Sequence, residues 1–521
     1  MGTRTLLKLV ASVIAALAML PLTICGAAPS GQRNVVYHLD LGEDPLSPRV
    51  RMELRGWDGE VRLTLPASHG RGLATDLLSH VRDLRAYDGD GREIPVSANG
   101  NVVGLYCPGD AALEYSLDLE GYRSGSDYLQ GLSTSSPWPY FPIAGDYVYL
   151  PGYAVFLVPE GEEVPCQVRF SLPEGWALAG PASEEDLVTG DLLRDPVLAG
   201  RLTRVENGNL ELIYPSEESR HLGLDELAKK AGALLAELKA HLPSAGEPGK
   251  TYVFVLPWED GSGEVSPLIA EPFYSTLALF LPTETSPLSD QVLGEISRQA
   301  TGMFIRRCAD FSDDALWFRE GLAWYFMDIL PYRAGLWGSS TTWDRMLRQY
   351  RSYEDVSGAV SLSQAGTAEY PGERESAMLC HGGAIACATM DAELQAPAAG
   401  NTDILRFLEL LSSSAGERGA NPVTSQDILD LLSSHTGRNW KPFFDRYVFG
   451  RETIPASAFS SLDVAPRDER AVQPIRTGSP GLAKWTALIL AVLVVFALPF
   501  FLEPYTLRPR KEGFLERVLR E

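Results

Sequence analysis

The fold of this chain is decided by the stretch Leu316-Trp317-Phe318-Arg319-Glu320-Gly321-Leu322-Ala323-Trp324-Tyr325-Phe326, which is apolar apart from one base and one acid. Its length and apolar content predict a helix. An earlier segment, Gly294-Glu295-Ile296-Ser297-Arg298, lies in another predicted helix, which Ser286 and Pro287 are expected to start. Apolar residues recur along this helix at helical spacing, at Val292, Ile296, Ala300 and Met303. Two consecutive helices therefore each carry a carboxylate, Glu295 or Glu320.

The residues on both sides of these helices predict a mixed α/β unit followed by more helices. Residues 222–242 have helical spacing, and residues 251–256 and 276–281 are apolar strand candidates. From residue 287 to 450 almost everything indicates helix, with breaks expected at 310–314, 335–340, 357–372 and 415–422. Thr424 and Asp427 are expected to cap the start of one helix, and Gly437 its end.

The first part of the chain has a different pattern. Residues 33–180 contain short runs of alternating polar and apolar residues, such as 51–55 and 61–65, separated by Asp-Gly and Pro-Glu-Gly turns. Strands of period two with frequent turns are typical of an antiparallel β-sandwich. The predicted fold class is therefore α+β, with the sandwich first and the helices last.

Composition excludes several classes of protein. The chain has 521 residues, 45% of them hydrophobic, which is enough for two or three domains with their own cores. Its 68 acidic residues outnumber its 45 Lys and Arg, giving a net charge of -23. Binding to nucleic acid requires clustered cations, so we expect no nucleic-acid partner.

The two ends of the chain predict its location. Residues 1–28 resemble a signal peptide, with Arg4 and Lys8 before an apolar run and small residues at its end. Residues 485–502 hold one polar residue, Thr486, and at ~1.5 Å per residue they cross the hydrocarbon core of a bilayer. We expect a stalk at 455–482, a transmembrane helix at 483–503 and a cytoplasmic tail at 504–521, because Lys and Arg exceed Asp and Glu in that tail. The predicted location is the cell membrane, with a single pass and the N-terminal part outside.

Several stretches together resemble a known group of enzymes, the gluzincin metallopeptidases, and more narrowly the glycyl aminopeptidase family. They occur in the expected order and cover most of the part between the signal peptide and the membrane span, at residues 81–88, 150–156, 172–176, 316–321, 333–336 and 443–450. The resemblance implies a thermolysin-like α/β domain over residues 205–340 and a helical C-terminal domain over residues 341–454.

Carried over residue by residue, the resemblance assigns four positions. Glu295 falls on the general base, Glu320 on the carboxylate ligand of zinc, and Gly294 and Arg298 on the two histidine ligands. Glycine offers no side-chain ligand, and arginine places a permanent cation where Zn²⁺ would lie. No two of the seven histidines are four residues apart. We therefore expect no metal and no cofactor, unless an unrecognised arrangement still holds zinc.

The resemblance also suggests two peripheral positions. The family places an oxyanion-stabilising tyrosine in a stretch that corresponds to residues 377–384, where Cys380 and His381 are the polar candidates. A packing role for His381 is the open alternative. Glu271 is the candidate for holding the amino terminus of a substrate, and an ordinary solvated loop acid is the alternative.

The predicted function is that of a membrane-anchored extracytoplasmic metallopeptidase homologue. It is expected to lack zinc and proteolytic activity, and to bind a peptide or protein partner, with the bilayer contacted through residues 483–503. One alternative is an active aminopeptidase-like hydrolase with a non-standard site, and another is a structural component of a membrane complex. We further hypothesise that Arg298 pairs with Glu320, Glu295 or both; in the alternative, it belongs to a solvated helix face.

Overall fold

The structure is a computed structural model that describes residues 33–42, 44–65, 77–121, 143–144, 147–181, 187–215, 223–241, 250–258, 269–272, 274–282, 285–368, 372–396, 402–418, 421–462 and 464. These residues belong to the unit that runs from Met1 to Ala465, and the unit Pro466–Glu521 lies outside them. The predicted signal peptide, transmembrane helix, tail and most of the predicted stalk also lie outside the described residues. Within the described ranges, no helix is both long and apolar enough to cross a bilayer.

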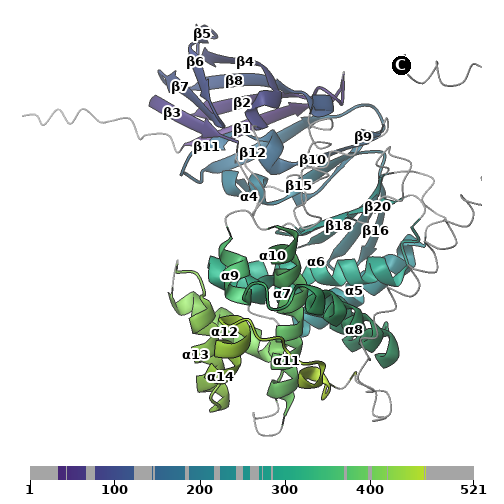
Figure 1. The fold of residues 1–521 in the computed structure, drawn as a ribbon. Coiled ribbons are helices and arrows are strands. Elements are labelled where there is room, and N and C mark those ends of the chain that lie inside the picture. Colours follow the sequence, from purple (N-terminus) through teal and green to yellow (C-terminus); the bar gives the residue numbers. More distant parts are fainter. Residues whose placement is uncertain are drawn as a thin grey trace, which may run out of the picture. The chain divides into compact units, whose positions relative to one another are not determined.

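Three sheets form the N-terminal β region, drawn in purple and blue in Figure 1. The largest has the order β14-β12-β1-β2-β8-β4-β5, with strands Leu187–Val188, Pro165–Ser171, Asn34–Asp40, Arg49–Arg55, Ala111–Leu117, Val81–Asp88 and Glu93–Ile94. The next has the order β11-β3-β7-β6, with strands Val158–Pro159, Gly59–Thr64, Val102–Cys107 and Val96–Asn99. The third has the order β13-β15-β10-β9, with strands Ala177–Ala179, Pro196–Gly200, Tyr147–Pro151 and Ile143–Ala144. Three short helices connect these strands: η1 (Leu77–His80), α3 (Gly152–Val155) and α4 (Thr189–Arg194).

This region differs from the predicted sandwich in two respects. Strands β1 and β12 pair in parallel, whereas the other pairs in these sheets are antiparallel. Pairing also continues beyond residue 180, because β15 pairs with both β10 and β13. The sequence between residues 181 and 200 lacks clear alternation, since all five residues of β15 are buried.

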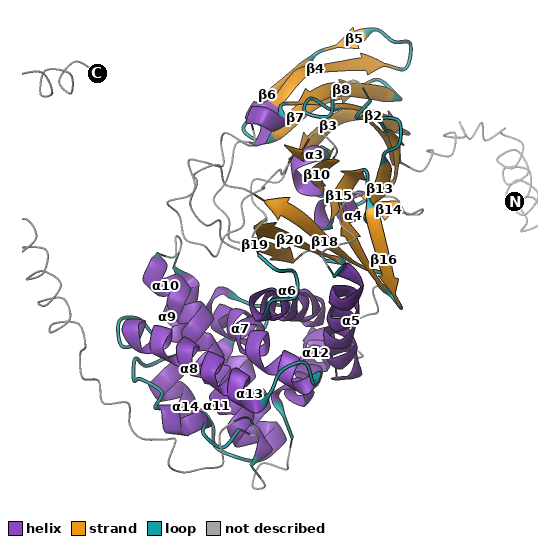
Figure 2. Ribbon diagram, turned by 90° about the vertical axis from the view of Figure 1, so that its right-hand side faces the viewer, coloured by secondary structure: helices purple, strands orange, loops and turns teal. Residues whose placement is uncertain are grey.

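A five-stranded mixed sheet follows, in the order β16-β17-β18-β20-β19. Its strands are Thr203–Asn207, Leu210–Tyr214, Thr251–Trp258, Thr276–Pro282 and Ile269–Pro272. The three central strands are parallel, and each edge strand is antiparallel to its neighbour. Alternate side chains serve two cores: Phe254 and Phe280 pack with Tyr149 of the β region, while Val253 and Leu279 pack with the helices. Figure 2 shows this sheet between the N-terminal sheets and the helices.

The remaining described residues are mostly helical. The longer helices are α5 (Leu224–His241), α6 (Asp290–Cys308), α7 (Leu316–Arg333), α8 (Ser339–Val356), α11 (Gly383–Gln395), α12 (Ile404–Arg418) and α13 (Ser425–Thr436). Shorter pieces are η6 (Asp313–Ala315), α9 (Leu362–Thr367), α10 (Glu373–Ala377), the π-helix η7 (Met378–Gly382), α14 (Lys441–Phe443), the π-helix η9 (Phe444–Val448) and η10 (Ala456–Phe459).

Helix α7 lies between α6 and α11 at the centre of the helical core. The hydroxyl of Ser297 on α6 donates to the backbone carbonyl of Phe326 at 2.6 Å. On the other side, a Cβ atom at Gly321 would overlap the backbone of Gly383, so only glycine allows this approach of α7 and α11. The central stretch from Leu316 to Phe326 therefore fixes the packing of three helices.

Several local predictions are confirmed and two are wrong. Thr424 and Asp427 form the predicted capping box, and Gly437 ends that helix at φ 65°. Helix α6, however, is capped by Ser289, whose hydroxyl accepts a hydrogen bond from the amide of Val292, and not by Ser286. The predicted break at 357–372 contains the short helix α9, because Ser361 caps it by accepting from the amide of Gln364.

Candidate functional site

The candidate site is built on the faces that α6 and α7 turn toward each other. Glu295 is buried on α6, with a side chain that is 10% exposed. Arg298, one turn later, donates from Nε to both carboxylate oxygens of Glu295 at 3.0 Å, and its Nη2 also pairs with Oε1. Gln299 donates to the same Oε1 at 2.6 Å. This part of the Arg298 hypothesis is confirmed, and the burial of Glu295 contradicts the alternative of a solvated helix face.

Glu320 on α7 has a different direct partner. Arg319, its neighbour in the sequence, donates to Oε1 of Glu320 from Nε at 2.9 Å and from Nη2 at 2.6 Å. Burial opposes ionisation of Glu320, but Arg319, Arg306 and Arg298 together lower its pKa. Arg298 thus acts on Glu320 through space and makes its hydrogen bonds to Glu295.

The electrostatics of the two arginines on α6 differ. Burial disfavours the charged guanidinium of Arg298, yet the adjacent Glu295 carboxylate raises its pKa. For Arg306, two turns further along α6, desolvation and the neighbouring guanidinium of Arg319 lower the pKa. Arg298 is therefore stabilised in its charged form by a neighbouring carboxylate, whereas the charged form of Arg306 is disfavoured by burial and by neighbouring guanidinium groups.

Gly294 faces a filled space. A Cβ built at Gly294 would lie 2.9 Å from Nη2 of Arg345 and 3.3 Å from Met327 and Trp337. Arg345 is fixed there, because its Nε donates to the buried Asp328 at 2.6 Å and its guanidinium lies 4.6 Å from the centroid of the Trp337 ring. A larger side chain at position 294 would have to displace this arginine.

These residues do not fit a zinc ion of the gluzincin type. Such a site needs two imidazoles and a carboxylate around one open position. Here the candidate base is hydrogen-bonded to a guanidinium, the glycine position is walled by Arg345, and the remaining carboxylate is held by Arg319. In the part of the chain that the structure describes, no three His, Cys, Asp or Glu residues are grouped to hold a metal ion. The correspondence of Gly294, Arg298 and Glu320 to ligand positions remains a prediction.

Cys380 and His381 lie on the π-helical turn η7, which packs against α7. The His381 ring meets the ring of Trp324 edge-on at 4.8 Å between centroids, and Arg298 lies 5.1 Å from the same indole centroid. Burial lowers the pKa of His381 and raises the pKa of Cys380 to about 12. Both groups are therefore neutral at physiological pH. Trp324 lies between His381 and Arg298 in the sense that its ring contacts both side chains.

Glu271 lies in the edge strand β19, where it pairs with Ala278 of β20. Its side chain lies outside the described residues, so its proposed role in holding an amino terminus stays a prediction. The sheet brings this edge strand beside α6, since β19 and α6 are in contact.

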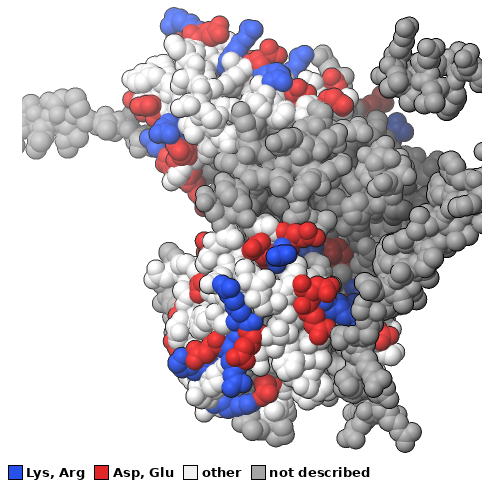
Figure 3. All heavy atoms as spheres, in the orientation of Figure 1, with Lys and Arg blue, Asp and Glu red and all other residues white. Residues whose placement is uncertain are grey.

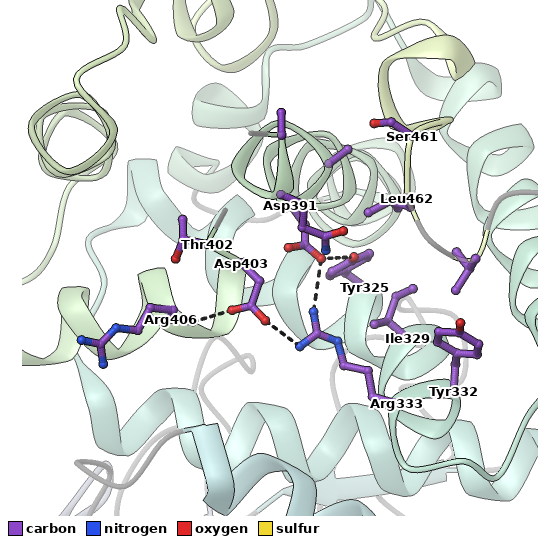
Figure 4. A pocket seen from close by; sticks show the side chains of 14 residues that line it. Tyr325, Ile329, Tyr332, Arg333, Asp391, Thr402, Asp403, Arg406, Ser461 and Leu462 are labelled. Atoms are coloured by element: carbon purple, nitrogen blue, oxygen red, sulfur yellow. Dashed lines mark hydrogen bonds and ion pairs between the residues drawn. The ribbon is translucent and has the colours of Figure 1, made fainter. Parts of the chain in front are cut away.

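A separate pocket of about 760 Å³ is lined by residues of α7, α11 and the start of α12, and Figure 4 shows their side chains. Its floor is a polar network: the Tyr325 hydroxyl donates to Asp391 at 2.6 Å, and Arg333 bridges Asp391 and Asp403 at 3.6 and 2.9 Å. Asp391 also accepts from the amide of Ile404 at 3.0 Å. These four groups satisfy one another, whereas the hydroxyl of Thr402, which also lines the pocket, is buried and has no hydrogen-bond partner among the described residues.

Charged side chains of both signs are mixed on the face of the molecule that Figure 3 shows. Figure 3 shows acidic and basic residues interspersed over the described part of the helical region on the face in view. The three arginines near Glu320 are thus a local feature, set in a chain whose net charge is -23.

Comparison with known structures identifies the class of fold. A crystal structure of an aminopeptidase N family protein from Idiomarina loihiensis matches with a TM-score of 0.64 and 14% identity, over 81% of this chain and 77% of that chain. An M1 zinc metallopeptidase mutant from Deinococcus radiodurans, bound to a Tyr-Ser-Ala substrate, matches with a TM-score of 0.50 and 14% identity, over 81% of this chain and 95% of that one. No family model and no curated protein matches the sequence.

The chain therefore has the fold of the M1 aminopeptidases, which confirms the prediction of a gluzincin-like architecture with a helical C-terminal part. At this level of identity the match concerns the fold alone. The narrower resemblance to glycyl aminopeptidases stays a prediction.

Sequence reasoning missed four residues that shape the site: Arg319, Arg306, Arg345 and Trp324. Arg319 could have been found, because it directly precedes Glu320 in the decisive stretch. Arg345 could not, since it comes from α8 and no local pattern places it beside Gly294. Arg306 acts on Glu320 and Trp324 contacts Arg298, and both relations depend on how α6 and α7 pack together.

Proposed function

We propose that this protein is a membrane-anchored, extracytoplasmic relative of the gluzincin aminopeptidases that binds peptide or protein segments without hydrolysing them. The observation that carries the proposal is the state of Glu295. A general base must be able to accept a proton from water, and both oxygens of this carboxylate accept hydrogen bonds from Arg298.

Two further features support a loss of the metal-dependent reaction. Arg345 occupies the space next to Gly294, and Arg319 takes Oε1 of Glu320, so the candidate ligand positions are engaged within the protein. The anchoring part of the proposal rests on the sequence, namely on the apolar segment 485–502 and the basic start of the chain.

The test is a joint measurement of metal content and peptidase activity on the purified full chain in detergent. We expect less than stoichiometric zinc and no release of amino acids from short peptides. Glu60, an exposed acid on β3, provides a matched control, because Glu60→Gln changes no residue of α6 or α7. Stoichiometric zinc with an activity that Glu295→Gln abolishes and Glu60→Gln preserves would overturn the proposal in favour of a non-standard hydrolase.

A gain-of-site variant sharpens this test. Restoring histidine at positions 294 and 298 should not by itself create a zinc site, because Arg345 occupies the space that the first imidazole needs. Adding Arg345→Ala to that double variant should allow zinc uptake if the inherited geometry is retained.

A further inference from the structure

The pocket in Figure 4 is lined by none of the residues assigned to the candidate site on α6 and α7. Its volume of about 760 Å³ lies within the range of about 300–1,000 Å³ that is usual for small-molecule sites. Its walls come from α7, α11 and the start of α12, and from residues 461, 462 and 464 near the end of the described chain. The pocket is therefore considered as a binding site in its own right.

The charges that line the pocket are balanced. Arg333 pairs with both Asp391 and Asp403, at 3.6 and 2.9 Å, and Arg406 pairs with Glu409 on the same helix. An entering cation would find Arg333 beside each carboxylate, and an entering anion would find two carboxylates beside Arg333. A charge taken out of water without a free counter-charge is costly. The pocket therefore favours a ligand that has no net charge.

Neutral polar side chains in the wall have hydrogen-bonding capacity that the protein leaves unused. Tyr332, Gln395 and Ser461 line the pocket, are at least partly exposed, and make no side-chain hydrogen bond to another described residue. The hydroxyl of Thr402 is buried and also lacks a partner in the described part of the chain. Most polar groups inside proteins have such a partner. A ligand that carries hydrogen-bonding groups is therefore better suited to this wall than an apolar one.

The mixture of donors and acceptors favours hydroxyl groups on the ligand. Asp403 can only accept, and its two oxygens receive one hydrogen bond each, from Arg333 and from the amide of Arg406, although a carboxylate has room for about four. The guanidinium of Arg406 can only donate, whereas Tyr332 and Gln395 can do both. A hydroxyl group donates and accepts through one atom, so it can satisfy neighbours of either kind. An amide N–H or C=O satisfies only one kind.

The pocket also has an apolar side. Figure 4 shows Tyr332 and Ile329 on one side of the pocket, and Asp403 and Thr402 on the other. The face of an aromatic ring carries a partial negative charge, which suits the C–H groups on one face of a sugar ring. A ligand with an apolar face and hydroxyl groups around its edge would therefore match both sides.

We propose that this pocket binds a neutral saccharide, whose hydroxyl groups contact Asp403, Arg406 and Gln395 and whose C–H face packs on the ring of Tyr332. A saccharide is uncharged, has hydroxyl groups that both donate and accept, and presents an apolar face. The site is separate from Glu295 and Glu320, so this inference goes beyond the proposed function and does not depend on it.

The test measures the binding of six probes to the purified full chain by saturation-transfer NMR. The detergent is a polyoxyethylene, because sugar-based detergents would compete. The probes are the methyl glycosides of glucose, galactose and mannose, those of glucuronate and glucosamine, which add a negative and a positive charge, and acetylalanine methylamide, which has amides and no hydroxyl group. At least one neutral glycoside should bind about 3-fold or more tightly than both charged glycosides and the diamide.

Variants locate the binding site. Gln395→Ala should weaken the neutral glycoside about 3- to 10-fold, because it removes hydrogen-bonding groups. Tyr332→Leu should weaken it by a similar factor, because it removes the aromatic face and the hydroxyl while an apolar side chain remains. Gln167→Ala on β12 and Tyr106→Leu on β7 are the matched controls at exposed positions, and they should change nothing. Equal melting temperatures would show that the variants are folded.

The outcomes are distinct from those that test the proposed function. The inference is overturned if no neutral glycoside binds the folded protein, or if a charged glycoside or the diamide binds as tightly. Glycoside binding that neither Gln395→Ala nor Tyr332→Leu weakens overturns it as well. None of these results bears on zinc content or peptidase activity, and stoichiometric zinc with activity that depends on Glu295 would leave the saccharide site in place.

Discussion

Two networks of charged side chains, one within α6 and one that joins α7 to α11 and α12, are built differently. In the α6 network, Glu295 is held by Arg298 and Gln299, which are its neighbours three and four residues along the same helix. In the pocket network, Tyr325 and Arg333 of α7 bind Asp391 of α11 and Asp403 at the start of α12. The first network is local, and the second joins three helices.

This difference separates structural from functional use of the same chemistry. Asp391 is 1% exposed, and burial raises its pKa, so its charge depends on Arg333 and Tyr325. The Arg298–Glu295 pair is more accessible, and its hydrogen bonds stay within α6. We infer that the pocket network stabilises the helical core, whereas the α6 network can be altered at less cost to the fold.

The largest effect should come from Arg333→Met. It leaves Asp391 buried without its cation, which typically costs about 3–5 kcal/mol of unfolding free energy. The apparent melting temperature of the detergent-solubilised chain is the measurement. Arg406→Met is the control at the rim of the same pocket: this arginine is exposed and, among the described residues, its side chain pairs with Glu409, so its loss should cost less than about 1 kcal/mol.

The pH dependence of that variant has a definite sign. Burial raises the pKa of Asp391, so the folded state favours the protonated acid, and its ionisation costs stability as pH rises. Without Arg333 that cost grows. The gap between Arg333→Met and the unaltered protein should therefore be wider at neutral pH than in acid, and a gap that is constant with pH would contradict our account of the network.

A smaller loss is expected for Tyr325→Phe. This change removes the hydrogen bond to Asp391 and keeps the ring, so we expect a loss of about 1.5–3 kcal/mol, typical of a bond to a charged group. Tyr332→Phe, which alters another tyrosine lining the pocket, serves as the control in the same melting experiment. If the two variants melt together, the Tyr325 hydroxyl has no special role.

The contrast between the networks also explains what could be predicted from sequence. The Arg298–Glu295 pair could be anticipated, since residues three apart on a helix are neighbours. The helices could be predicted from their periodicity, and the strands β18 and β20 from their apolar runs. The pocket network could not be anticipated, because Tyr325, Asp391 and Asp403 are distant in sequence and only tertiary packing brings them together. The same reason kept Arg345 out of the predicted site, although Gly294 was recognised as important.

Arg298→Met should cost less than Arg333→Met. Glu295 loses a partner but retains the hydrogen bond from Gln299, and the site is partly open to water. We expect a loss of about 1–2 kcal/mol, between the values for exposed and fully buried pairs. The melting temperatures of the two variants measure the comparison directly. If Arg298→Met is as damaging as Arg333→Met, the Arg298–Glu295 pair is a structural element, and our division between the two networks fails.

The smallest effect should come from Glu320→Gln, and its value lies in its pH dependence. Arginines lower the pKa of Glu320 against the opposing effect of burial, so its ionised form contributes stability above the unfolded pKa of about 4.3, and that contribution is lost as pH falls through the folded pKa. Because a third of the side chain is exposed, the contribution should stay below about 1 kcal/mol at neutral pH. Glu320→Gln should thus melt slightly below the unaltered protein at pH 7, and the difference should disappear in acid. The ionised Glu320 therefore adds stability as pH rises, whereas the ionisation of Asp391 costs stability as pH rises. Asp391 and Glu320 would then affect stability in opposite directions as pH changes, because burial dominates the pKa of Asp391 and neighbouring arginines dominate the pKa of Glu320. A difference for Glu320→Gln that grows in acid would mean that burial governs this carboxylate as well.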